Sequence, residues 1–236
     1  MRIWSSGNVL FLILLAVALF AALSYAVTQA GRSGGKDISR EKAELGAAEI
    51  IQYFTLLENT IQRMRLTGSV KLEHLDVSAS GYSNQAANSN CSTSRCRLFH
   101  PDGGGVSPRR LNTQYTDLTA TNWNGVTAHG ESVLYFMNVG VENVGTSLAD
   151  LVVLYGGVKL DICRAINVRM GLTTWNGPAL TDSHGTFAEH AGDVNPYPNP
   201  DGVLGDDASE FSGQRTFCSE QSGAWGSYAY QVLVAR

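Results

Sequence analysis

An uninterrupted apolar segment near the N-terminus, residues 9–27 (VLFLILLAVALFAALSYAV), limits what this chain can fold into more than any other feature. As an α-helix the segment would be about 28 Å long, at roughly 1.5 Å per residue. That length is close to the ~30 Å of the hydrocarbon core of a bilayer. A helix suits this environment because its backbone hydrogen bonds are satisfied internally. The segment therefore predicts a membrane-spanning helix.

A cleaved secretory signal is the alternative interpretation of the same segment. Ser24, Tyr25 and Ala26 form an acceptable small-x-small cleavage site after an apolar core, which would give a mature chain that begins at Val27. The apolar core is, however, longer than the ~7–15 residues usual in a signal peptide. We therefore favour an anchor.

The next part of the sequence predicts a second, amphipathic helix at residues 39–66, after a glycine-containing loop at residues 30–35. Apolar residues recur there at steps of three and four, which is the period of one helix face. The apolar face consists of Ile50, Phe54, Leu57, Ile61 and Met64, and charged residues (Glu44, Glu49, Glu58, Arg63 and Arg65) occupy other positions. We expect the apolar face to pack against the rest of the chain.

Residues 67–236 predict a β-rich head, and with the helices they indicate an α+β fold. Residues 132–141, 150–155 and 228–234 are rich in β-branched and aromatic side chains and are expected to form strands. Asp161 could cap a short helix that ends at Met170. The proline-containing residues 176–213 predict a long loop.

The four cysteines are Cys91, Cys96, Cys163 and Cys218, an even number that favours two disulfides in an exported protein. Three pairings are open from sequence. A local Cys91–Cys96 bridge is the simplest, and it leaves Cys163 to pair with Cys218. No C-x-x-C pair supports a metal site instead.

Charge excludes one class of partner. Only 16% of the residues are charged and the net charge is −4, so the basic surface that binds a phosphate backbone is missing. We expect no nucleic-acid partner.

Together, a short polar start ending in Gly7, an apolar helix, an amphipathic helix and a β-rich, disulfide-containing head resemble the type IV pilins and pseudopilins. The resemblance implies cleavage between Gly7 and Asn8 by a prepilin peptidase. It also implies a leader (1–7), a transmembrane and filament-core helix (8–30), a hinge and amphipathic helix (31–66) packed on a mainly antiparallel sheet, and a head (67–236).

The resemblance further implies a function. The chain would be a structural subunit or assembly factor of a pilus-like or secretion-linked filament and not an enzyme. It would contact membrane lipid and other pilin-like subunits, with its head in the periplasm or in a cell-surface filament. The alternative is an extracytoplasmic binding module that uses the apolar helix as a tether.

Two positions depart from the family pattern. Major subunits usually begin with an apolar residue and carry Glu five residues after the cleaved glycine, where this chain has Asn8 and Leu12. The chain is in this respect similar to minor, tip-located subunits.

Motifs for catalysis are weak. The sequence has no G-x-S-x-G motif. Asp182, Ser183 and His184 are adjacent, whereas members of a catalytic triad come from separate positions. The five histidines (His74, His100, His129, His184 and His190) show no metal-binding spacing. We expect no catalytic residues.

One acidic loop contains hard oxygen ligands of the kind that Ca²⁺ prefers. Some pseudopilins bind calcium in a comparable loop. The spacing here does not fit an EF-hand, so we interpret the loop as solvated and expect no cofactor. Its potential ligands are Asp193, Asn195, Asn199, Asp201, Asp206 and Asp207.

Overall fold

The structure is a computed structural model that describes residues 7–83, 86–117, 119, 132, 134–182, 203–220 and 226–236. Within the first helix, the side chains of residues 7–10 and 26–38 lie outside this description. The chain divides into two compact units, Met1–Lys42 and Ala43–Arg236, which are considered separately below.

A single long helix, α1 (Gly7–Thr67), begins the described chain. The loop expected at residues 30–35 is therefore a wrong prediction. Each glycine lowers helix propensity by ~1 kcal/mol relative to alanine, but unlike proline it keeps its N–H donor. The ladder of backbone hydrogen bonds can thus continue through Gly31, Gly34 and Gly35.

The amphipathic part of α1, in the second unit, packs as its sequence predicts. Glu44, Glu49, Arg63 and Arg65 are exposed and Glu58 is half-buried. All five residues of the apolar face are buried in the main core: Ile50, Phe54, Leu57, Ile61 and Met64.

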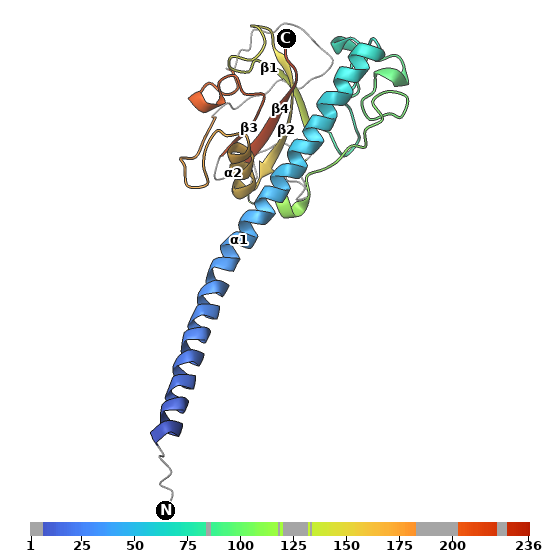
Figure 1. Ribbon diagram of the computed structural model, residues 1–236. Coiled ribbons are helices and arrows are strands. Elements are labelled where there is room, and N and C mark those ends of the chain that lie inside the picture. Colours follow the sequence, from blue (N-terminus) through green and yellow to red (C-terminus); the bar gives the residue numbers. More distant parts are fainter. Residues whose placement is uncertain are drawn as a thin grey trace, which may run out of the picture. The chain divides into compact units, whose positions relative to one another are not determined.

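In the part of the second unit that the structure describes, four antiparallel strands form one sheet in the order β1-β2-β4-β3 (Figure 1). They are β1 (Leu134–Val139), β2 (Asp150–Val158), β3 (Thr216–Ser219) and β4 (Ser227–Val234). The expected α+β class with an antiparallel sheet is confirmed. The sequence predicted β1, β2 and β4 but not the short strand β3.

Both faces of the sheet are covered, so its strands are apolar on both sides. One face, which includes Phe136, Val153 and Leu233, belongs to the core shared with α1. The opposite face, which includes Met137, Leu154 and Val232, forms a second core under Leu180, Leu204 and Phe211. The segments that contain these last three residues thus cover this face of the sheet, as α1 covers the other.

A short helix, α2 (Leu160–Arg169), packs against β3 and β4. The residue before its first turn is Lys159, which provides no side-chain cap. Asp161 lies inside the first turn, where its Oδ1 accepts a hydrogen bond from the Ile162 N–H at 2.9 Å. The expected helix exists, but Asp161 is not its N-cap.

Candidate functional site

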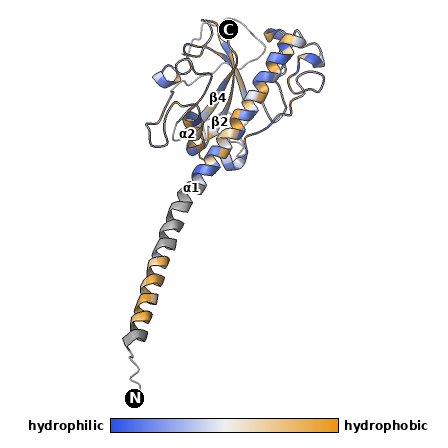
Figure 2. Cartoon of the chain, viewed as in Figure 1, coloured by the Kyte–Doolittle hydropathy of each residue, from blue (hydrophilic) through white to orange (hydrophobic). Residues whose placement is uncertain are grey.

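Exposed apolar side chains characterise the N-terminal part of α1. In residues 11–25, whose side chains the structure describes, every residue is exposed, including Phe11 (63%), Phe20 (73%) and Leu23 (64%). Figure 2 shows this stretch as predominantly hydrophobic. Consecutive helical residues point in all directions around the axis, so no side of the segment is covered.

Within the described residues, no helix contains an apolar stretch of the length needed to cross a membrane. The expected processing residues Gly7 and Asn8 are the first residues of α1. Their side chains, like the leader residues 1–6, lie outside the description.

The structure contains both favoured disulfides, Cys91–Cys96 and Cys163–Cys218. Cys163 lies on α2 and Cys218 on β3, and both are fully buried. This bridge therefore fastens the helix to the edge strand of the sheet. The Cys91–Cys96 bridge instead closes a local loop.

A buried polar network accompanies the long bridge. Glu220 is 3% exposed, and its Oε2 accepts a charge-assisted hydrogen bond from Arg164 Nε at 2.7 Å. The same oxygen forms an ion pair with Arg164 Nη2 at 2.6 Å. The guanidinium also donates to the carbonyl of Gly177 at 2.7 Å. Because the buried carboxylate is paired, the network avoids the desolvation cost of an isolated charge. Arg164 thus links α2 to Glu220, directly after β3, and to Gly177, in the chain that follows α2.

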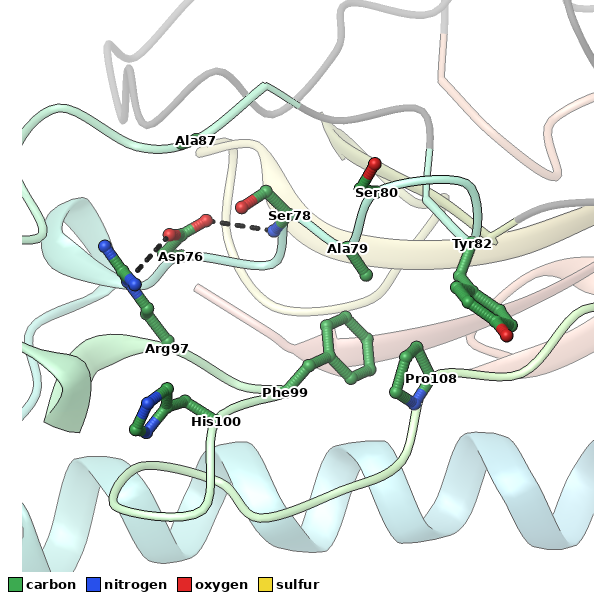
Figure 3. Close-up of a pocket in the computed structure, with 10 residues that line it drawn as sticks. All are labelled: Asp76, Ser78, Ala79, Ser80, Tyr82, Ala87, Arg97, Phe99, His100 and Pro108. Carbon is green, nitrogen blue, oxygen red and sulfur yellow. Dashed lines mark hydrogen bonds and ion pairs between the residues drawn. The ribbon is translucent and has the colours of Figure 1, made fainter.

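The short bridge lies beside a pocket of about 410 Å³ in the head (Figure 3). Residues 76 and 97 pair as an isolated β-bridge: Asp76 N donates to the Cys96 carbonyl at 2.9 Å, and Leu98 N to the Asp76 carbonyl at 2.8 Å. The pocket is lined by two segments and Pro108: Asp76, Ser78, Ala79, Ser80, Tyr82 and Ala87 from the first, and Arg97, Phe99 and His100 from the second.

An ion pair occupies one end of this pocket. The Asp76 side chain is 3% exposed, and its Oδ1 accepts a hydrogen bond from the Ser78 N–H at 2.9 Å. Its Oδ2 lies 3.7 Å from Arg97 Nε, which is beyond hydrogen-bonding distance. The ion pair with Asp76 orients the Arg97 guanidinium. Because the Arg97 side chain is 54% exposed, its N–H donors stay accessible.

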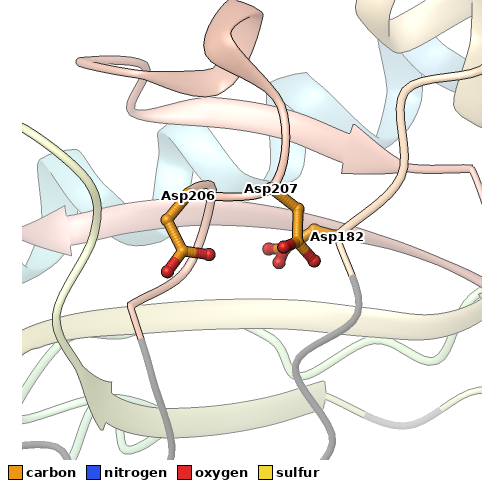
Figure 4. A group of neighbouring side chains, drawn as sticks. All are labelled: Asp182, Asp206 and Asp207. Atoms are coloured by element: carbon orange, nitrogen blue, oxygen red, sulfur yellow. The ribbon is translucent and has the colours of Figure 1, made fainter.

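A second cluster consists of three carboxylates, Asp182, Asp206 and Asp207, with oxygen atoms within 4.8 Å of one another (Figure 4). Asp182 is fully buried and the other two are exposed. Oxygen ligands of this type could hold a Ca²⁺ ion. Such acidic groups are also common on protein surfaces without an ion.

Neutral donors already satisfy part of the Asp182 carboxylate. Its Oδ2 accepts hydrogen bonds from the Gly205 N–H at 2.9 Å and from the Tyr230 hydroxyl at 3.0 Å. The Tyr228 hydroxyl donates to the Asp182 carbonyl. Burial raises the pKa of Tyr228 to about 12 and that of Tyr230 well above its usual value, so both hydroxyls keep their protons as donors.

The structure brings only some of the sequence-based candidate residues together. Asp206 and Asp207 of the acidic loop lie together, and their partner Asp182 was considered only as a neighbour of Ser183 and His184. The other candidates fall outside the described residues: Ser183, His129, His184, His190, Asp193, Asn195, Asn199 and Asp201.

The pocket at Asp76 and Arg97 was not predicted. Its two halves come from polar segments with no periodic pattern, and the β-bridge between residues 76 and 97 brings them together. The one available sequence signal was the Cys91–Cys96 spacing, which indicates an ordered loop immediately before Arg97.

Comparison with known proteins adds no further constraint. The chain matches no family model, and no curated protein or solved structure shows significant similarity to it.

Proposed function

We propose that this protein is a pilin-like structural subunit, or an assembly factor, of a type IV pilus-like or secretion-linked filament. Before assembly its apolar helix holds it in the inner membrane with its head in the periplasm. Its partners are membrane lipid, the N-terminal helices of other pilin-like subunits and a prepilin peptidase that cuts between Gly7 and Asn8. The protein carries out no catalysis in this role.

The observation that carries the proposal is the exposure of apolar side chains around all sides of residues 11–25. Covering such a surface is strongly favourable, at roughly 25 cal/mol per Å² of apolar area removed from water. The side chains of a bilayer-bound helix are covered by lipid. The helices of neighbouring subunits would cover the same side chains in a filament.

The second unit supports the same role. The apolar face of α1 that includes Phe54, Leu57 and Ile61 is buried against an antiparallel sheet. This is the packing that the resemblance to pilins implies for the amphipathic helix. The oxidised cysteines fit a head that lies outside the cytoplasm, where disulfides persist.

Polar substitutions in the exposed apolar segment test the proposal. Leu12→Ser and Leu19→Ser, made singly, keep most of the segment apolar and should still allow membrane insertion. A filament subunit should nevertheless lose incorporation into filaments, since its packing surface is changed. Leu148→Ser, at an exposed leucine outside α1, is the matched control and should incorporate normally.

The competing function is an extracytoplasmic binding module that is merely tethered by the same helix. Such a protein would tolerate Leu12→Ser and Leu19→Ser as well as it tolerates Leu148→Ser, and sheared surface fractions would contain no filament with this chain. That result would overturn the proposed function.

A further inference from the structure

The pocket at Asp76 and Arg97 has two chemically different parts. In Figure 3 the rings of Phe99, Pro108 and Tyr82 follow one another along the pocket, and the Asp76–Arg97 ion pair lies at its other end. Apolar rings with a few fixed polar groups are typical of small-molecule sites, whose volumes are ~300–1,000 Å³. At about 410 Å³, this pocket is suited to a small ligand.

The polar groups favour a ligand that both donates and accepts hydrogen bonds. The planar Arg97 guanidinium offers N–H donors in a fixed geometry, and the hydroxyls of Ser78 and Ser80 can donate or accept hydrogen bonds. Asp76 balances the charge of Arg97, so the pair does not select for a strongly charged ligand. A neutral polyhydroxylated molecule matches this combination.

The rings restrict the ligand further. A pyranose sugar has a face of C–H groups that can lie on an aromatic ring, and hydroxyls around its edge. Tyr82 is 42% exposed and available for such stacking, and Arg110 lies over its ring at 5.5 Å. Arg110 Nε also donates to the Gly81 carbonyl at 2.5 Å, which holds the tyrosine-bearing turn in place.

The loop that carries Arg97, Phe99 and His100 is fixed at both ends. The Cys91–Cys96 bridge precedes it. A glycine turn closes it, because Gly104 N donates to the Arg97 carbonyl at 3.0 Å and Gly105 N to the His100 carbonyl at 2.9 Å. A site held in this way loses little conformational entropy when a ligand binds.

We propose that this pocket is a saccharide-binding site that accepts one neutral pyranose unit, such as the terminal residue of a surface glycan. The sugar ring stacks on Tyr82 and Phe99, and Arg97 donates to its hydroxyls. Asp76 orients Arg97 and does not itself need to contact the sugar. The site goes beyond the filament role and does not depend on it.

Saturation-transfer NMR on the full chain tests the site. The protein is kept in a zwitterionic detergent, because detergents with sugar head groups would compete. The probes are methyl pyranosides of glucose, galactose and mannose, N-acetylglucosamine, and glucuronate as a charged comparison. We expect transfer to at least one neutral pyranoside with millimolar affinity, strongest at the C–H groups of one ring face.

Two variants and a control locate the binding. Tyr82→Ala and Arg97→Gln should each weaken binding at least tenfold, which corresponds to about 1.4 kcal/mol. Tyr82 is exposed, so its replacement should leave the melting temperature unchanged and keeps the test valid if Arg97→Gln alters folding. Arg169→Ala, at an exposed arginine on α2, should bind like the wild type.

Three results would overturn the inference. The first is no transfer to any of the sugars, and the second is transfer that Tyr82→Ala leaves unchanged. The third is binding of a proline- or aromatic-rich peptide that is lost in Tyr82→Ala while no sugar competes with it.

Discussion

Asn167 on α2 forms two hydrogen bonds with the backbone of Cys218 on β3. Its Nδ2 donates to the Cys218 carbonyl at 2.7 Å, and its Oδ1 accepts from the Cys218 N–H at 2.9 Å. Nδ2 also donates to Glu220 Oε1 at 3.0 Å. One buried amide therefore satisfies the backbone beside the disulfide and connects it to the Arg164–Glu220 pair.

This arrangement predicts that Asn167→Asp is strongly destabilising. A carboxylate would place negative charge against the Cys218 carbonyl and the Glu220 carboxylate in a buried site. We expect a loss of about 2–4 kcal/mol, measured by thermal unfolding of the full chain in detergent. Asn59→Asp, at an exposed position of α1, is the matched control and should change stability by less than ~0.5 kcal/mol. Equal effects of the two substitutions would contradict the role of Asn167.

The two disulfides should contribute unequally to stability. The Cys163–Cys218 bridge spans 55 residues and the Cys91–Cys96 bridge spans 5. Loop-closure entropy gives about 4 kcal/mol for the longer loop and about 2 kcal/mol for the shorter one. Replacing both cysteines of the long bridge with alanine should thus lower the melting temperature more than the same change at Cys91 and Cys96. The opposite order would show that loop length does not dominate here.

Gly104 should tolerate no side chain. A Cβ at this position would lie 2.2 Å from the backbone oxygen of Leu98, and backbone cannot move aside cheaply. Gly104→Ala is expected to cost about 1–3 kcal/mol by overpacking. A Cβ added at Gly140 would have Val203 Cγ2 as its nearest neighbour, at 4.0 Å, so Gly140→Ala should be nearly neutral. Comparable melting temperatures for the two variants would contradict the close approach.

Asp150 should make the head less stable as the pH rises. Burial raises the pKa of Asp150 from 3.8 to about 6, although the Arg236 N–H, at 2.8 Å from its Oδ1, opposes the shift. The folded chain therefore binds this proton more tightly than the unfolded chain. The resulting stabilisation is complete below about pH 4 and is lost as the pH rises through about 6.

Replacing this carboxylate isolates its contribution. Asp150→Asn should remove a pH dependence worth up to about 3 kcal/mol between pH 4 and pH 7, since one pKa unit corresponds to ~1.36 kcal/mol. The measurement is the difference in unfolding free energy between wild type and variant across this range. Asp161→Asn, an exposed carboxylate on α2, serves as the matched control. If both variants gave the same pH profile, Asp150 would not be the responsible group.

Periodic patterns made much of the fold predictable. The structure confirms the helix predicted from the spacing of Phe54, Leu57 and Ile61. It also confirms the strands β1, β2 and β4 predicted from their apolar content, because these side chains form the buried cores. The short strand β3 forms because it pairs with β4, and its own four residues do not predict that pairing. The helix through residues 30–35 continues because local glycine propensity is weak compared with a hydrogen-bonded ladder.

The candidate sites were less predictable because they depend on contacts between distant segments. Asp182 and Asp206 are far apart in the sequence. The chain at Asp182 is held against β3 by a hydrogen bond from the Asp182 N–H to the Ser219 hydroxyl at 2.8 Å, and its carboxylate lies close to that of Asp206. Asp76 and Arg97 likewise meet through backbone pairing. Neither spacing has a period that a sequence would reveal.

We propose that residues 8–30 form a helix that is kept in the mature protein and packs in a filament. The intact mass of the chain extracted from its native membrane tests this most directly. We predict a mature chain that begins at Asn8, as cleavage after Gly7 by a prepilin peptidase requires. An uncleaved mass would favour the tethered binding module. A mature chain that begins at Val27 would contradict the account, because no apolar helix would remain to build a filament.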